Sequence, residues 1–142
     1  MNKEVVMLKE IFESFDSEVT EEFLELLLNA MRISYIFNKD FRNNIEGFEG
    51  RYLFKSRDGK ITVAAIFENG RMNVKEKEIG DTDITVSFRS AKALREFIFS
   101  PKPDILGAIL RQDVVVDGNF NYMYKFAFMA KRLQLMVTGR LH

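Results

Sequence analysis

Apolar positions in the first part of the chain recur every three or four residues, which is the spacing of an amphipathic helix. They predict a short helix over residues 4–15 and a longer one from a capping Thr20 to about Lys39. The longer segment carries too many apolar residues for a narrow stripe. We therefore expect it to be buried on more than one side.

Five short apolar runs further along the chain have the features of strands. The first three, over residues 50–55, 60–68 and 71–78, are separated by Asp58-Gly59 and Asn69-Gly70, which are strong hairpin signals. The second run is apolar on both faces, which predicts an interior strand covered on both sides. The two remaining runs lie at 83–88 and 114–116.

Three capping signals divide the rest of the chain into helices. Ser90 and Asp104 can cap helices over residues 91–99 and 105–110, and Asn119 can cap the last one. This last helix, from Phe120 to about residue 135, is apolar or aromatic on almost every side for three turns. A surface helix shows a single apolar stripe. The last helix is therefore either a central core helix or one whose face lines a cavity.

Composition leaves this choice open. The chain has 142 residues, enough for one domain with a substantial core, and it contains 14 Phe and 7 Met but no Trp. Large and flexible apolar side chains fill irregular cores, and they also adapt to varied ligands. Both readings therefore account for the excess of Phe and Met.

Charge and chemistry exclude several classes of function. The formal net charge is zero, which argues against a nucleic-acid binder. There is no Cys, and the sole His is the terminal His142, so we expect no metal site, no cofactor and no catalytic triad. No phosphate-binding Gly motif is present. No apolar run reaches the ~20 residues of a membrane span, and no signal peptide is apparent, so a cytoplasmic location is expected.

The order of motifs after residue 80 resembles the sterol carrier protein type two family. The motifs are an aspartate-led strand at 83–87, a proline turn at 100–104, and a short strand at 113–117 that enters the last helix through Gly118-Asn119. Asn119 replaces the acid that is usual in the family, and Ser100-Pro101 stands where Gly-Lys is common. The resemblance covers about residues 20–135 of a single domain over 1–142, so residues 1–16 form an additional N-terminal helix.

The resemblance implies an α+β fold. It has a mixed five-stranded sheet, formed by an antiparallel meander and two further strands, with helices over one face and a hydrophobic tunnel between the layers. The expected function is non-enzymatic binding or carriage of a lipid or another elongated apolar ligand, such as a fatty acid, acyl-CoA, phospholipid or sterol. The alternative is an interaction or regulatory subunit with a filled core, whose N-terminal helix covers a homodimer or partner surface. A third hypothesis is an enzyme with paired carboxylates in the pocket.

The site expected from this reading combines apolar walls with basic side chains at the mouth. The cavity residues are Phe37, Phe41, Phe48, Ile105, Ile109, Phe120, Met123, Tyr124, Ala127 and Phe128. Lys39 and Arg42 are candidates for contact with an anionic head group, since a charge at an apolar mouth fixes the orientation of a ligand. Ordinary surface bases are the alternative for both residues.

Overall fold

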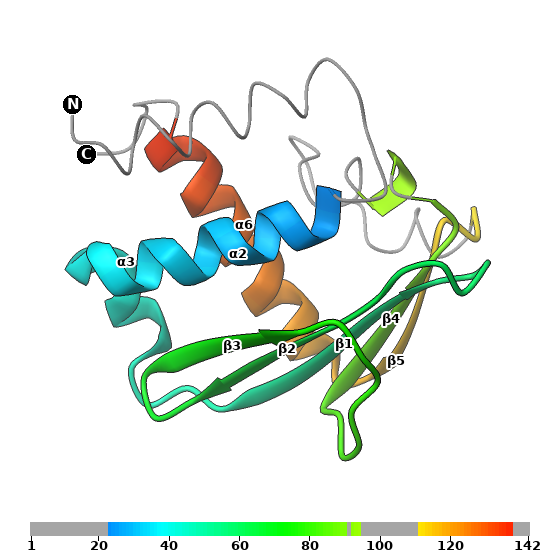
Figure 1. Cartoon of the computed structure of the whole chain (residues 1–142), viewed down its shortest axis with the longest axis horizontal. Helices are drawn as coiled ribbons and strands as arrows, with labels where there is room; N and C mark the ends of the chain where they lie inside the picture. Colours follow the sequence, from blue (N-terminus) through cyan, green and yellow to red (C-terminus); the bar gives the residue numbers. More distant parts are fainter. Residues whose placement is uncertain (1–22, 91, 95–110, 138–142) are drawn as a thin grey trace.

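A computed structural model describes residues 23–90, 92–94 and 111–137 of the chain. They form two layers, a five-stranded sheet and a layer of helices that covers one of its faces (Figure 1). The strand order across the sheet is β3-β2-β1-β4-β5. The α+β arrangement expected from the sequence is therefore confirmed.

The sheet is mixed because one of its four pairings is parallel. β1 (Gly50–Ser56), β2 (Thr62–Glu68) and β3 (Arg71–Lys75) form an antiparallel meander. β4 (Ile84–Phe88) returns parallel to β1, and β5 (Val114–Gly118) pairs antiparallel with β4. The five predicted strands are all present, although β2 starts two residues later than predicted and β3 ends three residues earlier.

Both hairpins turn where the Gly-containing pairs predict. Asn69 and Gly70 have φ angles of +54° and +72°, the left-handed conformation that a tight two-residue turn between twisted strands requires. At the other turn, the Asp58 carboxylate accepts hydrogen bonds from the Ser56 hydroxyl at 2.6 Å and from the Lys60 backbone N–H at 3.0 Å. Local chemistry therefore fixes both turns.

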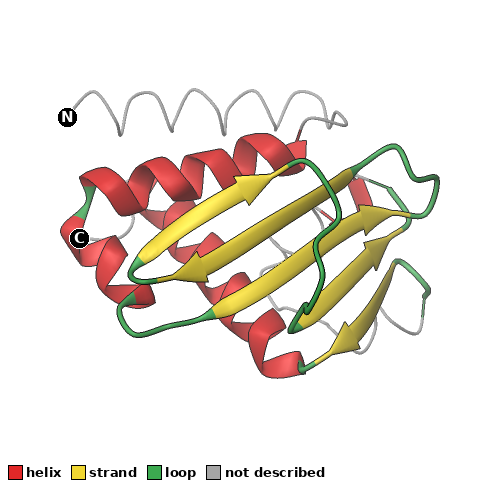
Figure 2. Cartoon of the chain, turned by 60° about the horizontal axis from the view of Figure 1, so that its bottom comes forward, coloured by secondary structure: helices red, strands yellow, loops and turns green. Residues whose placement is uncertain are grey.

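The connection from β3 to β4 crosses the face of the sheet that the helices leave free (Figure 2). It is tied to β1 by the Arg51 guanidinium, which donates to the Gly80 carbonyl at 3.0 Å, and by an ion pair of 3.3 Å between Lys55 and Glu78. Two β2 residues on this face, Ala64 and Ile66, are buried. The prediction that this strand is covered on both sides is confirmed.

Helices cover the other face, and four helical elements of the described residues have defined bounds. They are α2 (Phe23–Phe37), α3 (Lys39–Arg42), the 3-10 helix η1 (Asn43–Ile45) and α6 (Phe120–Val137). The long helix predicted to reach Lys39 is interrupted at Asn38, which has an extended backbone and accepts a hydrogen bond from the Phe41 N–H at 2.9 Å. An Asn side chain competes in this way with the helical hydrogen bonds.

The predicted cap at Ser90 is present, because its Oγ accepts a hydrogen bond from the Ala93 N–H at 3.1 Å. Of the predicted helix over 91–99, only residues 92–94 are described, and they are helical. The predicted N-terminal helix over 4–15 and the predicted helix over 105–110 lie outside the described residues.

Candidate ligand-binding site

α6 has two faces of opposite exposure although its sequence is apolar almost all round. It begins after Gly118-Asn119, where the Asn119 side chain accepts a hydrogen bond from the Asn121 N–H at 2.9 Å, and so the predicted cap is confirmed. The inner face of α6 is buried against the sheet and α2, and it consists of Met123, Phe126, Met129, Ala130 and Leu133.

Side chains fill the layer between the inner face of α6 and the sheet. The Phe126 ring lies 4.9 Å from the Phe54 ring and 5.7 Å from the Tyr52 ring, measured between centroids. The Tyr52 hydroxyl donates to the Tyr122 carbonyl at 2.7 Å, which joins β1 to the first turn of α6. These contacts are those of a packed core, and the described residues do not show the tunnel that the resemblance implies.

The outer face of α6 carries a row of exposed aromatic side chains, Phe120, Tyr124 and Phe128. Their exposed fractions are 41%, 57% and 50%. They are spaced by four residues and therefore form one stripe along the helix. The Arg132 guanidinium lies 5.7 Å from the centre of the Phe128 ring, so a positive charge borders this stripe.

Four of the five α6 residues predicted for a cavity wall therefore lie together, and one does not. Phe120, Tyr124 and Phe128 share the outer face with the half-buried Ala127. Met123 points to the opposite side and is fully buried. The reason is geometric, because Met123 is rotated toward the sheet by about 60° from Phe120 and by about 100° from Tyr124.

The three Phe residues predicted for the mouth are not brought together. Phe37 is 65% exposed at the end of α2, whereas Phe41 is buried and stacked on Tyr35 at 4.5 Å between ring centroids. Phe48 is half-buried against Phe67, and the Lys125 ammonium lies 5.3 Å from the centre of its ring. Ile105 and Ile109 lie outside the described residues.

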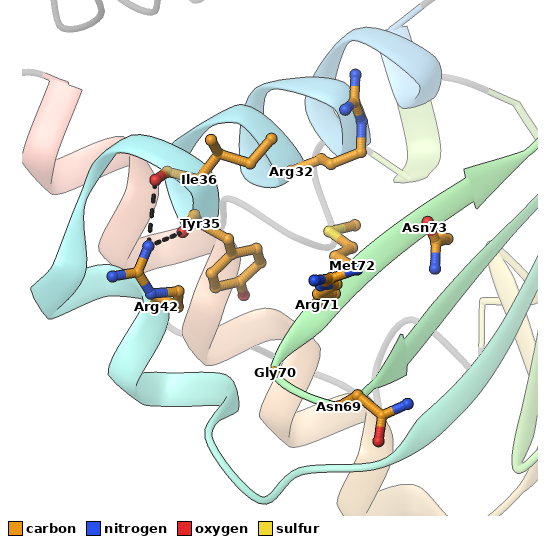
Figure 3. Close-up of a pocket in the computed structure, with 9 residues that line it drawn as sticks. All are labelled: Arg32, Tyr35, Ile36, Arg42, Asn69, Gly70, Arg71, Met72 and Asn73. Carbon is orange, nitrogen blue, oxygen red and sulfur yellow. Dashed lines mark hydrogen bonds between the residues drawn. The ribbon is translucent and has the colours of Figure 1, made fainter.

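The two head-group candidates differ in their surroundings. Lys39 is exposed in the first turn of α3. Arg42 donates to the carbonyls of Tyr35 and Ile36 at 3.3 and 3.2 Å, at the C-terminal end of α2, where unpaired carbonyls attract a cation. Arg42 also lines a cleft of about 440 Å³ between α2 and the turn of the β2–β3 hairpin (Figure 3).

Sequence reasoning missed the other basic residues of this cleft, Arg32 and Arg71. Arg32 belongs to α2 and Arg71 starts β3, so the fold alone brings them to one hollow. Because the helix and the hairpin are far apart in the sequence, no regular residue spacing indicates that Arg32 and Arg71 lie together. The one local signal was Asn69-Gly70, which fixes where β3 begins.

Burial keeps two tyrosine hydroxyls at the centre of the molecule protonated. The Tyr35 hydroxyl donates to Sδ of Met129 at 2.8 Å and thereby joins α2 to α6. Burial raises the pKa of Tyr35 and of Tyr52 far above the ordinary tyrosine value, because the charged phenolate would lose its hydration. Both groups are therefore neutral structural donors at physiological pH.

The described residues contain no cluster of three His, Cys, Asp or Glu side chains that could hold a metal ion. Of the helices in the described ranges, none has the length and apolarity needed to cross a bilayer.

Solved structures share this arrangement of a mixed sheet covered by helices on one face. The UbiJ-SCP2 ubiquinone synthesis protein matches 78% of this chain and 98% of its own, with 16% identity and a TM-score of 0.56. Sterol carrier protein domain 2 of Helicoverpa armigera matches 88% of this chain and 94% of its own, with 18% identity and a TM-score of 0.52. The chain has an SCP2-like fold.

The same fold also occurs within a larger enzyme. A stereoselective inverting sec-alkylsulfatase from Pseudomonas sp. matches 62% of this chain, with 19% identity and a TM-score of 0.54, and this chain spans only 14% of that enzyme. No protein-family model and no curated protein matches the sequence. The structural likeness therefore defines the fold, and function has to be argued from the site.

Proposed function

We propose that this protein binds or carries a lipid or another elongated apolar ligand without changing it chemically, and that the outer face of α6 is the contact surface. The observation that carries the proposal is the row of Phe120, Tyr124 and Phe128. Three aromatic side chains on one face leave much apolar surface in contact with water. Contiguous apolar patches of this kind mark interaction sites.

The geometry of the row suits an elongated ligand. Side chains four residues apart on a helix lie about 6 Å apart along its axis, so the three rings extend over about 12 Å. An acyl chain or a fused ring system laid along the helix would contact all three rings. Arg132, beside Phe128, places a cation at one end of the row, where an acidic or polar head would be favoured.

Binding without chemistry is also part of the proposal. The fold shared with sterol carrier protein domains supports it, as does the sequence, which offers no nucleophile paired with a histidine. The match to part of a sulfatase suggests a different role. A domain of this fold could hold an apolar substrate for a larger enzyme.

Fluorescent fatty-acid binding tests the proposal. The double variant Tyr124→Ala/Phe128→Ala removes two exposed rings and should weaken binding at least about tenfold, because each ring contributes ~1 kcal/mol or more of buried apolar contact. Val115→Ala is the matched control, since Val115 is also half-exposed but lies on β5 with its side chain on the other face of the sheet. Equal affinity in both variants, or no uptake by the unaltered chain and no lipid in native mass spectrometry, would refute the proposal.

The packing of the described side chains between α6 and the sheet supports a second candidate, an interaction subunit that uses the same face to pair with another copy. The rings of Tyr52, Phe54 and Phe126 pack against one another, and this part of the core needs no ligand to fill it. Analytical ultracentrifugation of the full chain separates the two functions. A dimer that the Tyr124→Ala/Phe128→Ala variant converts to a monomer supports pairing, whereas a monomer at all concentrations excludes it.

A further inference from the structure

The cleft between α2 and the β2–β3 hairpin concentrates positive charge in a protein whose formal net charge is zero. Three of its nine lining residues are arginines, Arg32 from α2, Arg42 from α3 and Arg71 from β3 (Figure 3). None of the nine is acidic. A cleft lined by three arginines and by no acidic residue favours an anion.

Two of the three guanidinium groups have no partner within the described part of the chain. Neither Arg32 nor Arg71 makes a side-chain hydrogen bond or an ion pair with another described residue. Glu68 pairs with Arg71 in the strand register, yet the two side chains form no ion pair. Both groups can therefore bind a ligand without first breaking an internal contact.

Arg42 is the fixed member of the set. Its Nη1 is held by the carbonyls of Tyr35 and Ile36, which leaves its other guanidinium nitrogens for a ligand. In Figure 3 the Arg32 guanidinium points away from Arg42 and from the hairpin. An anion held at Arg42 would therefore have to draw in the long side chains of Arg32, from α2, and of Arg71, from β3.

The remaining surfaces of the cleft narrow the class of ligand. Tyr35 and Met72 form a buried apolar floor, and Ile36 is half-exposed beside them. An adjoining hollow of about 330 Å³ shares Asn69 and Gly70 but is lined by Glu46 and Glu49. These carboxylates would repel a second anionic group. The cleft thus suits one anionic group attached to an apolar body.

We propose that this cleft binds a phosphate monoester with an apolar substituent. A planar carboxylate is satisfied by one guanidinium, whereas a phosphate monoester carries a charge near −2 and three terminal oxygens, so it can accept from three separate arginines. The substituent rests on Tyr35, Ile36 and Met72. The proposal is independent of lipid binding at the outer face of α6, because the two surfaces share no residue.

Phenyl phosphate is the probe, followed by two-dimensional amide NMR of the full chain at low ionic strength. The expected result is saturable shifts of the amides of residues 69–73, with binding at least about tenfold weaker in Arg32→Gln/Arg71→Gln, since two charge-assisted contacts are lost. The matched control is Lys75→Gln/Lys77→Gln, which removes two exposed positive charges outside the cleft and should bind as the unaltered chain does. Circular dichroism checks that both variants fold.

Two results would overturn the proposal. One is an equal loss of binding in both double variants, which would indicate a general charge effect. The other is a set of shifts centred away from residues 69–73. Hexadecyl phosphate distinguishes the source of the phosphate: tighter binding than phenyl phosphate, abolished by Arg32→Gln/Arg71→Gln, identifies a lipid head group, and equal affinity identifies a small phosphate ester. Phenyl phosphate binding that persists in Tyr124→Ala/Phe128→Ala separates this site from the proposed lipid site.

Discussion

Gly118, at the end of β5, lies directly against the backbone of Asp83, the residue before β4. Gly118 has a φ of +124°, and a Cβ atom there would lie 3.1 Å from the carbonyl carbon of Asp83 and 2.9 Å from Cα of Ile84. The next residue, Asn119, donates its backbone N–H to the Asp83 carbonyl at 3.1 Å. This close approach of two backbones sets where the sheet ends and where α6 begins.

Gly118→Ala should therefore destabilise the protein by about 2–5 kcal/mol, because it combines backbone strain with a clash that a neighbouring backbone cannot relieve. Urea unfolding followed by circular dichroism measures the loss. Gly80→Ala is the control, since a Cβ at Gly80 meets nothing within 4 Å and the free energy of unfolding should stay within about 0.5 kcal/mol. Equal stability of the two variants would contradict the close approach at Gly118.

Phe126 and Phe128 provide a test of the two faces of α6 within one turn of helix. Phe126→Ala should cost about 3–5 kcal/mol of unfolding free energy, because it leaves a cavity among Tyr52, Phe54 and α6. Phe128→Ala should cost about 1 kcal/mol or less, because half of its side chain is already in water. Thermal and urea unfolding of both variants check the difference. A large cost at Phe128 would indicate that its ring is covered in solution.

The same pair of residues shows why the sequence predicted the helix but not its orientation. Phe126 and Phe128 are identical side chains in an almost uniformly apolar segment, so no periodicity marks which one faces the sheet. By contrast, Asp58-Gly59 and Asn69-Gly70 carry their structural preference in their own backbone and side chains, and the hairpins were predictable for that reason. Only the position of the sheet, a tertiary property, separates the two faces of α6.

The candidate site also has a part that the sequence predicts and a part that depends on the tertiary structure. Phe120, Tyr124 and Phe128 share one stripe because four-residue spacing on a helix is a local property, and all three were predicted for the cavity wall, but so was the buried Met123. The cleft of Arg32, Arg42 and Arg71 could not be predicted, because it forms where the end of α2 meets the turn of a hairpin. Arg42 was found among the bases near the expected mouth, but its bond to the carbonyls of α2 depends on the break at Asn38.

The hydrogen bonds of Asp58 predict that the protein loses stability in acid. The hydrogen bond from the Ser56 hydroxyl, followed by that from the Lys60 N–H, lowers the pKa of Asp58 in the folded protein. A carboxyl whose pKa is lower in the folded state stabilises the protein above its ordinary pKa of about 3.9, and this contribution disappears as the pH falls through the folded-state value. The exposed turn should make the effect small.

Comparing the unaltered chain with Asp58→Asn isolates the contribution of the Asp58 charge to stability. At about pH 6 the unaltered chain should melt at a higher temperature than the variant, and the difference should shrink toward zero near pH 2, where both side chains are neutral. Differential scanning calorimetry at several pH values provides the measurement. A difference that stays constant across this range would show that the carboxylate charge does not contribute to the turn.

Tyr35 and Tyr52 predict a loss of stability at the alkaline end of the pH range. Burial is the main cause that raises the pKa of each hydroxyl, and a neighbouring ionised tyrosine adds to it, Tyr52 for Tyr35 and Tyr122 for Tyr52. Both hydroxyls also donate hydrogen bonds, to Sδ of Met129 and to the Tyr122 carbonyl, and a phenolate could donate neither. The folded state therefore holds both protons where the unfolded chain, with a tyrosine pKa near 10, releases them.

The sign of the effect follows from this difference. The contribution of these tyrosines to stability is fully present below about pH 10. It is lost as the pH rises further, because ionisation of the tyrosines then lowers the free energy of the unfolded chain. The urea concentration at the midpoint of unfolding should be lower at about pH 11 than at about pH 8. Ultraviolet absorbance should show full phenolate formation only on unfolding. Tyr35→Phe/Tyr52→Phe should lose about 1–3 kcal/mol at pH 8 through its missing hydrogen bonds, yet its midpoint should depend less on pH over this range. A double variant with the same alkaline dependence as the unaltered chain would show that other groups cause it.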